Sequence, residues 1–370
     1  MSSAGGGSDR PRVVALGGGH GLSCSLQALR LVTPHLTAVV TVADDGGSSG
    51  RLRDELGVLP PGDLRMAVAA LVGNDGWGRT WEELLQHRFG GTGPLAGHPV
   101  GNLLLAGLTE STGDPVTALE VVCRVVGAAG RVLPASPVPL ELAAEVVGCD
   151  PARPEAVTEV VGQVAVATTR GRVRSLRVRP SDPPACVEAV AAVKEADWVV
   201  FGPGSWFTSV LPHLLVPDLR AALERTAARR LLVLNLAPQS GETEGFSPEA
   251  HLEVLAAHAP ELSLDVVLAD PAAVLDTRGL MAAAERAGAR LVLTPVGRGE
   301  GTAQHDPVLL AAAYTAILDR TADLHQTADL DQTADLDQTA NLDQTGGPAS
   351  TTGATSTAGQ PGTGGQDRHE

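Results

Sequence analysis

The sequence predicts an α/β fold: a Rossmann-like, mostly parallel sheet with helices on both faces, a β-rich inserted lobe and a disordered C-terminal tail. Short apolar runs alternate with helical patterns along most of the chain, which is typical of a parallel sheet covered on both faces. Several strand-like segments follow one another near residues 128–182, which predicts the inserted lobe. From residue 319 the composition changes, and a six-residue repeat follows.

The expected elements follow the chain in order. Strands are expected at 12–16, 37–42, 131–134, 140–147, 160–168, 173–178, 198–201, 231–236, 265–268 and 290–293. Helices are expected at 22–31, 63–71, 81–89, 100–109, 115–126, 185–196, 209–215, 218–228, 248–257, 278–287 and 307–318. Three of the predicted strands end in polar or glycine-rich turns that lead toward helices, and ligands of parallel sheets bind at such strand ends.

Three regions follow from composition. Residues 1–11 are expected to form a disordered leader, and residues 12–318 the Rossmann-like domain with its insertion. Residues 319–370 combine a hexad repeat with Gly/Ser/Thr-rich sequence, and their low hydrophobicity predicts disorder. This tail holds nine acidic and two basic residues, and so −7 of the formal net charge of −16. Its threonines are candidate sites for a Ser/Thr kinase; a solvated spacer is the alternative.

Composition also excludes several classes of protein. Scarce aromatic residues (2%) and the acidic balance argue against a nucleic-acid partner, which would need stacking platforms or a basic surface. Lys194 is the only lysine, so no Walker-type phosphate loop is present. The four cysteines form no CxxC pair, and no signal peptide or membrane-length apolar run occurs. We therefore expect a cytoplasmic protein without membrane insertion.

The first predicted strand is followed by a glycine-rich turn into a helix. Such a turn brings backbone N–H groups to an anion at the helix N-terminus, which predicts a nucleotide or phosphate site; a purely structural turn is the alternative. Leu22 occupies the place of the third glycine of GxGxxG, so a nicotinamide dehydrogenase has little support. The candidate ligand-binding residues are Gly17, Gly18, Gly19, His20, Gly21, Leu22 and Ser23.

A second polar loop follows the second strand. One of its two aspartates is expected to hold a ribose or base, and the other to face a reacting phosphate, with Asp45 as the candidate Mg²⁺ ligand. Turn formation or helix capping is the alternative for both. An arginine in this loop could pair with phosphate. The candidate residues here are Asp44, Asp45, Gly46, Gly47, Ser48, Ser49 and Arg51.

Two helix starts and a second glycine turn complete the set. Asp63 and Arg65 follow a Pro-Pro-Gly turn, with an N-cap role as the alternative for Asp63. His98 and Asn102 stand at the start of another helix. His98 is a candidate proton carrier or hydrogen-bond donor to phosphate, and Asn102 is a candidate amide contact. We expect the two glycine turns to share one pocket, so that Gly19 and Gly204 lie on the same cavity. The residues expected after the later strands are Gly202, Pro203, Gly204, Ser205, Thr208, Ser209 and Asn235.

Several segments together resemble the gluconeogenesis factor family, the YvcK group of the CofD-like superfamily. They are GGGHGLS (17–23), TVADDGGSSGRLR (41–53), PPGDLR (60–65), HRF (87–89), LAGHPVGNLLLAGLTE (95–110), GPGSWFTSVLPHLL (202–215) and QSGET (239–243). The resemblance implies a Rossmann-like fold and binding of a UDP-sugar such as UDP-N-acetylglucosamine. It also implies a cytoplasmic regulator that links carbon metabolism to cell-wall synthesis and cell shape through a protein partner. Assembly into a homo-oligomer stays open.

The enzyme branch of this superfamily implies an alternative function. It transfers 2-phospho-L-lactate to a deazaflavin in coenzyme F420 synthesis, and its acidic loops correspond to Asp44, Asp45 and Asp63. A transferase of this type would use Asp45 and Asp63 in catalysis with Mg²⁺. The sequence departs from the regulator pattern at His20, where Thr is usual, and at Gln304, where Arg is frequent. Arg298 is the candidate to compensate for the missing arginine.

Overall fold

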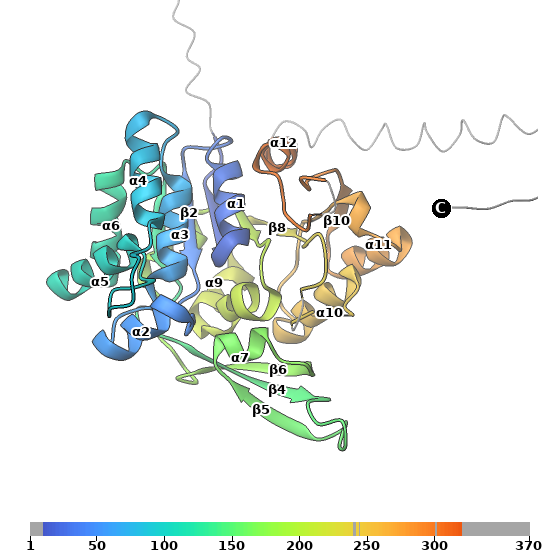
Figure 1. Cartoon of the computed structure of the whole chain (residues 1–370). Coiled ribbons are helices and arrows are strands. Elements are labelled where there is room, and N and C mark those ends of the chain that lie inside the picture. The colour runs from blue at the N-terminus through green and yellow to red at the C-terminus, as the bar shows by residue number, and fades with distance from the viewer. Residues whose placement is uncertain (1–9, 240–241, 244, 300–301, 320–370) are drawn as a thin grey trace, which may run out of the picture. The chain divides into compact units, whose positions relative to one another are not determined.

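The computed structural model describes residues 10–239, 242–243, 245–299 and 302–319 (Figure 1). The expected leader lies outside this part except for residues 10 and 11, and the expected tail lies outside it except for residue 319. Among the described helices, none has the length and apolar character that crossing a membrane requires.

Seven parallel strands form the central sheet, in the order β10-β9-β8-β7-β1-β2-β3. The order runs outward in both directions from β1 and β7, so the sheet has a switch point between these two strands. This arrangement confirms the predicted Rossmann-like fold. The strands are β1 (Val13–Gly17), β2 (Leu36–Val40), β3 (Arg131–Pro134), β7 (Trp198–Phe201), β8 (Arg229–Val233), β9 (Val266–Ala269) and β10 (Arg290–Leu293).

The central strands are apolar throughout because helices cover both of their faces. All residues of β1 and β7 are buried, and in the register of the sheet Val13 lies beside Leu36 on β2 and Trp198 on β7. The connections that follow β1 and β7 lead to opposite edges of the sheet. Right-handed crossovers therefore place α1 (Gly19–Leu29) and α9 (Pro217–Arg225) on opposite faces.

Most of the helices begin at a residue that suits a helix N-terminus. Aspartate or serine caps α4, α6, α10, α11 and α12 by accepting a backbone N–H, and proline stands in the first turn of α3, α6, α9, α10 and α12. The remaining bounds are α2 (Gly47–Leu56), α3 (Pro61–Leu71), α4 (Gly76–Gln86), α5 (Val100–Thr112), α6 (Pro115–Val126), α8 (Val187–Glu195), α10 (Pro248–His258), α11 (Thr277–Arg286), α12 (Pro307–Leu318), and the short turns η1 (Trp206–Val210), η2 (Leu211–Leu215) and η3 (Pro271–Ala273).

The inserted lobe is a three-stranded antiparallel sheet in the order β5-β4-β6, with one short helix. Its elements are β4 (Glu141–Val147), β5 (Val157–Val161), α7 (Gln163–Ala167) and β6 (Arg172–Arg179). Exposed ion pairs join its strands, among them Arg179 with Glu141 and Glu159. Figure 1 shows α7 on the side of the lobe that faces the main sheet, and α7 packs against β4 and η1.

Four local predictions need correction. Residues 131–134 were expected near the lobe, but β3 pairs with β2 as an edge of the main sheet. The strand expected at 160–168 ends at Val161, and the alternation of Val and Ala that follows belongs to α7. The loop expected at 46–50 is the N-cap and first turn of α2, in which Ser48 and Ser49 make buried hydrogen bonds. The helix expected at 209–215 is a π turn followed by a 3₁₀ turn.

Candidate ligand-binding site

A cavity of about 720 Å³ lies where the strand order of the main sheet reverses, at the carboxyl ends of β1 and β7. Both glycine turns line it, so Gly19 and Gly204 share one cavity, as the sequence predicts. Of the other residues expected to bind ligand, the lining contains Gly18, His20, Gly21, Ser23, Asp63, Pro203, Ser205, Ser209 and Asn235. This position is the one at which open parallel sheets bind ligands.

The first glycine turn forms the N-terminus of α1. Gly18 is the N-cap in extended conformation, and a Cβ atom there would lie 2.4 Å from Oδ2 of Asp63 and 2.8 Å from Cγ2 of Thr41. Gly19 has a φ of +59°, in the left-handed region that favours glycine. No acidic side chain occupies the first turn of α1. Gly19 N–H already donates to the Asp63 carboxyl, and the other backbone N–H groups at this helix end suit an anion in the cavity.

The second glycine turn is fixed against the first and against the end of β8. The Asn235 side chain bonds the loop twice: Gly204 N donates to its Oδ1 at 3.0 Å, and its Nδ2 donates to Gly204 O at 2.8 Å. Gln239 continues the chain of contacts, since its Nε2 donates to Ser205 Oγ at 3.1 Å. Asn235 thus positions the loop as well as lining the cavity.

Glu242 supports this loop from behind. Its carboxylate accepts hydrogen bonds from Phe207 N at 3.1 Å and from Thr208 Oγ1 at 2.6 Å. Burial raises the pKa of Glu242, while the hydrogen bonds from Thr208 and Phe207 oppose the rise. Thr208 was expected to contact ligand, but its hydroxyl bonds Glu242 and is absent from the lining. The contact between Thr208 and Glu242 spans 34 residues of chain, so no local sequence pattern indicates it.

Asp63 is the carboxylate of the cavity. It lies in the first turn of α3, whose N-cap is Pro60, so the N-cap alternative does not hold. Burial, and secondly the charge of Asp44, raise the pKa of Asp63 to about 7, against the opposing effects of Gly19 N–H and Arg65. Asp44 stands behind it: its Oδ1 accepts from Gly46 N at 2.9 Å. Asp63 can therefore hold or release a proton near neutral pH.

Asp45 is directed away from the cavity. Its Oδ2 accepts from Gln163 N and its Oδ1 from Val164 N, both at 2.9 Å, so it caps α7 of the lobe. The expectation that it faces a reacting phosphate is not met in this arrangement, because both oxygens face the helix and Asp45 does not line the cavity. Gln163, which the sequence did not single out, does line the cavity.

The remaining predicted polar residues form a network apart from the cavity lining. Ser48 Oγ is 2.7 Å from His98 Nδ1 and accepts from Asn102 Nδ2 at 3.0 Å. Arg65 Nε donates to Asn102 Oδ1 at 2.9 Å, and its Nη1 bonds Gln86. Burial lowers the pKa of His98. These four predicted residues are all buried, and they tie α2, α3 and α5 together.

Other predicted residues also have structural partners. Ser49 Oγ accepts from Gly62 N at 3.0 Å, which joins α2 to α3. Arg51, expected to pair with phosphate, instead donates to the carbonyls of Pro94 and Ala96. Residues Gly17, Leu22, Gly46, Gly47 and Gly202 likewise shape the two turns and α2 without lining the cavity.

The last wall of the cavity comes from the segment before α12. Arg298 and Gln304 line it, and Arg298 Nη1 donates to Gln304 Oε1 at 3.3 Å. His305 is buried, and its Nε2 has no hydrogen-bond partner among the residues that the structure describes. Burial lowers the pKa of His305, against the opposing effects of a backbone hydrogen bond with Leu234 and of the charge of Asp270. Arg298 and His305 thus line the same cavity as the two glycine turns.

The chemistry of the carboxylates limits how Mg²⁺ could bind. Within the described residues, no group of three or more His, Cys, Asp or Glu side chains is arranged to hold a metal ion. Magnesium is commonly bound by one or two carboxylates together with phosphate oxygens and water. Asp63, with Asp44 behind it, fits such a partial site if a ligand supplies phosphate oxygens. Asp45 is not placed for it, because it does not line the cavity and its oxygens accept the N–H groups of α7.

Comparison with known proteins identifies the family. The model of the family described as "2-phospho-L-lactate transferase CofD" matches residues 13–292. A "Putative gluconeogenesis factor" of Mycobacterium leprae is 55% identical over 310 residues, covering 83% of this chain and 86% of the relative. The chain belongs to the CofD family and, within it, to the gluconeogenesis factors. A "Gluconeogenesis factor" of Halalkalibacterium halodurans is 38% identical over 278 residues, covering 75% of this chain and 83% of that protein.

A solved structure shares the fold of this chain. A crystal structure of a UPF0052 family member from Bacillus halodurans has a TM-score of 0.73 and 34% sequence identity, covering 83% of this chain and 99% of that one. The CofD match ends at residue 292, so the wall with Arg298, Gln304 and His305 lies beyond it. The glycine turns, Asp63 and Asn235 all lie inside the matched CofD segment.

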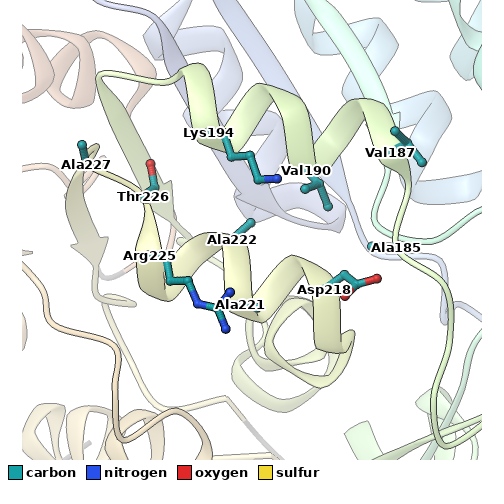
Figure 2. A pocket seen from close by; sticks show the side chains of 10 residues that line it. All are labelled: Ala185, Val187, Val190, Lys194, Asp218, Ala221, Ala222, Arg225, Thr226 and Ala227. Carbon is teal, nitrogen blue, oxygen red and sulfur yellow. The ribbon is translucent and has the colours of Figure 1, made fainter.

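A second hollow of this gluconeogenesis factor, of about 500 Å³, lies between α8 and α9 (Figure 2). Lys194 and Arg225 line it from the two helices, and it runs to Thr226 and Ala227, which precede β8. It shares no lining residue with the cavity at the glycine turns.

Proposed function

We propose that this gluconeogenesis factor binds a UDP-sugar, such as UDP-N-acetylglucosamine, and acts as a regulator rather than through turnover of the ligand. The observation that carries the proposal is the cavity shared by Gly19 and Gly204 at the switch point of the sheet. Two glycine turns and the N-terminus of α1 meet there, an arrangement that suits the phosphates of a nucleotide.

The other lining residues support a sugar nucleotide. Arg298 brings a positive charge to the cavity, and Ser205, Gln239 and Gln304 bring polar groups that suit the hydroxyl and amide groups of a sugar. A volume of about 720 Å³ lies within the usual range for small-ligand sites. Gln304 and Arg298 are in contact, so Arg298 can fill the role of the arginine that is frequent at position 304.

A transferase of the 2-phospho-L-lactate type is the second candidate, and one observation favours it. The pKa of Asp63 is raised to about 7, chiefly by burial, and strongly shifted groups in cavities are frequent in active sites. In that function Asp63 and Asp44 would hold Mg²⁺ with the phosphate oxygens of the substrate, and the metal would neutralise charge during transfer. The engagement of Asp45 by α7 favours the regulator, because the transferase was expected to use Asp45.

Calorimetry and a product assay would separate the two. The full chain is titrated with UDP-N-acetylglucosamine, UDP, GDP and NAD, and is then incubated with a deazaflavin acceptor, a 2-phospho-L-lactate donor and Mg²⁺. The regulator predicts heat with the uridine ligands and no product. The absence of heat with both uridine ligands would overturn it. Product that disappears in Asp63→Asn, with the fold intact, would establish the transferase instead.

The cellular role is part of the same proposal. The regulator would act in the cytoplasm and link carbon metabolism to cell-wall synthesis and cell shape through a protein partner. The names of the relatives support the metabolic half of this role. Growth and cell shape of a strain lacking the protein, compared on a sugar and on a gluconeogenic carbon source, would test it. Phosphorylation of the threonine-rich tail would be tested in the same strain with threonine-to-alanine variants.

A further inference from the structure

The inserted lobe reaches the ligand cavity at one point, the N-terminus of α7. Gln163 is the first residue of this helix and lines the cavity together with the two glycine turns. The rest of the lobe, from β4 to β6, contributes no other lining residue. A molecule in the cavity can therefore contact the lobe directly only through Gln163.

Asp45 holds that point of contact in place. Its two carboxylate oxygens accept the N–H groups of Gln163 and Val164 at 2.9 Å each. Gly162 has a φ of +101°, and a Cβ atom there would lie 2.4 Å from Asp45 Oδ2. Both the conformation and the close approach require glycine at this position. The loop after β2 and the start of α7, 118 residues apart in the sequence, are thus in close contact through Asp45.

The helix depends on these contacts because it is short. α7 has five residues, and a helix of this length is not stable alone in water. Its other anchors are β4, where Leu142 O accepts from Gly162 N at 2.8 Å, and η1 of the second glycine turn. α7 is also the connection between β5 and β6, the two outer strands of the lobe. A change in its position is therefore transmitted to both edges of the lobe sheet.

We propose that Gln163 binds the ligand and that Asp45 is the positioning residue through which occupancy of the cavity is coupled to the lobe. The inference rests on the proposed function, because it takes a UDP-sugar as the ligand. An occupied cavity holds Gln163, and through it α7, in the arrangement that Asp45 caps. An empty cavity leaves α7 without this contact, held by Asp45 and by packing against β4, β5 and η1. The lobe then differs in mobility between the two states, which gives a regulator a surface that reports its ligand.

The first test is hydrogen exchange on the full chain with and without UDP-N-acetylglucosamine. In the wild-type chain the ligand is expected to slow exchange of the Gln163 and Val164 amides and of β5 and β6. Without ligand, Asp45→Ala should speed exchange of the two amides about tenfold, and Asp45→Asn, which keeps one acceptor oxygen, by less. Thr158→Ala is the matched control, at an exposed position on β5, and should leave both amides unchanged.

The second test is calorimetry on the same variants. Gln163→Ala should weaken UDP-N-acetylglucosamine binding by about threefold to tenfold, the range of one hydrogen bond, and should abolish the ligand-dependent protection of β5 and β6. If Gln163 contacts the ligand, Gln163→Ala should remove this protection and leave exchange in the ligand-free chain unchanged. If Gln163 has only a structural role, the variant should alter exchange in the ligand-free chain as well. Glu159→Gln, on the exposed face of β5, should bind as the wild-type chain does.

The outcomes separate this inference from the function on which it rests. Absence of heat with both uridine ligands in the wild-type chain would overturn the proposed function and the coupling together. Wild-type binding that Gln163→Ala leaves unchanged, or ligand binding that does not protect the lobe, would overturn the coupling alone. Equal exchange of the two amides in Asp45→Ala and the wild-type chain would overturn the positioning role of Asp45.

Discussion

Gly21 of α1 lies in backbone contact with Gly204 of the second glycine turn. A Cβ atom on Gly21 would lie 2.6 Å from Cα of Gly204 and 2.2 Å from O of Pro203. The two turns are therefore packed together so closely that position 21 has no room for a side chain, whereas a Cβ atom on Gly204 would lie 3.7 Å or more from its neighbours. Glycine at position 21 is needed for this approach rather than for its backbone conformation, since its φ is not positive.

We expect Gly21→Ala to destabilise the fold by about 1–3 kcal/mol, because a methyl group cannot enter the contact unless backbone atoms move. The change should also weaken ligand binding, since the two turns must separate. Gly107→Ala is the matched control: Gly107 is exposed within α5, and a Cβ atom there would have no other atom within 4 Å. It should stabilise the protein by about 0.5–1 kcal/mol, through helix propensity. Urea denaturation measures both, and equal effects of the two changes would contradict the packing argument.

The pKa of Asp63 leads to a prediction about pH. Its pKa rises from 3.8 to about 7 on folding, so between these values the folded state binds the proton more tightly than the unfolded state. The free energy of unfolding should therefore fall as pH rises from about 4 to 7, by less than about 1.4 kcal/mol per unit, because the side chain is partly exposed.

The matched variant for this prediction is Asp63→Asn, which stays neutral at every pH. The stability of the variant relative to the wild-type chain should increase from about pH 4 to 7 and then level off. Denaturant unfolding at a series of pH values measures this difference. A difference that stays constant over this pH range and beyond it would show that the Asp63 carboxyl is not perturbed by folding.

The fold was largely predictable because its signal is local. Buried parallel strands such as β1 and β7 are apolar on both faces and stand between helical patterns, so their sequence alone indicates their environment. α7 was mistaken for a strand because its alternation of Val and Ala has a period of two. The cap that makes it helical comes from Asp45, 118 residues earlier in the chain. A distant contact of this kind leaves no local pattern.

The same distinction applies to the site. The two glycine turns were found because a backbone cradle depends on glycine at particular positions, and both line the cavity. Ser48, His98 and Asn102 were chosen for their chemistry, yet they bond one another in the interior. Gln163 was missed because its place in the cavity depends on how the lobe docks. Residue type alone does not distinguish a ligand contact from a buried partner.

Asn235 should matter through both of its hydrogen bonds to Gly204. We expect Asn235→Ala to cost about 1–3 kcal/mol of stability, because it leaves the N–H and C=O of Gly204 without these partners. Asn235→Asp keeps the acceptor but loses the donor, and places a carboxylate beside a carbonyl, so it should bind a diphosphate ligand more weakly than Asn235→Ala does. Urea denaturation and calorimetry measure the two effects. Ser111→Ala, at an exposed position on α5, is the control and should change stability by less than about 0.5 kcal/mol.

Glu242 and Thr208 offer a test of how the second glycine turn is supported. Their hydrogen bond is 2.6 Å long and buried, and burial raises the pKa of Glu242. A double-mutant cycle with Glu242→Gln and Thr208→Val should give a coupling energy of about 1–3 kcal/mol, as expected for a buried hydrogen bond to a charged group. Denaturation of the two single variants and the double variant gives this energy.

The exposed pair of Arg177 and Glu159 in the lobe, 3.4 Å apart, provides the comparison. Solvent screens this pair, so the same cycle there should give less than about 1 kcal/mol. Burial raises the pKa of Glu242, so its charged form is disfavoured in the fold. The coupling energy between Glu242 and Thr208 should therefore change as the pH falls through the pKa of Glu242. The coupling energy between Arg177 and Glu159 should stay small. Equal coupling energies in the two pairs would mean that Glu242 holds the turn no more firmly than a surface contact does.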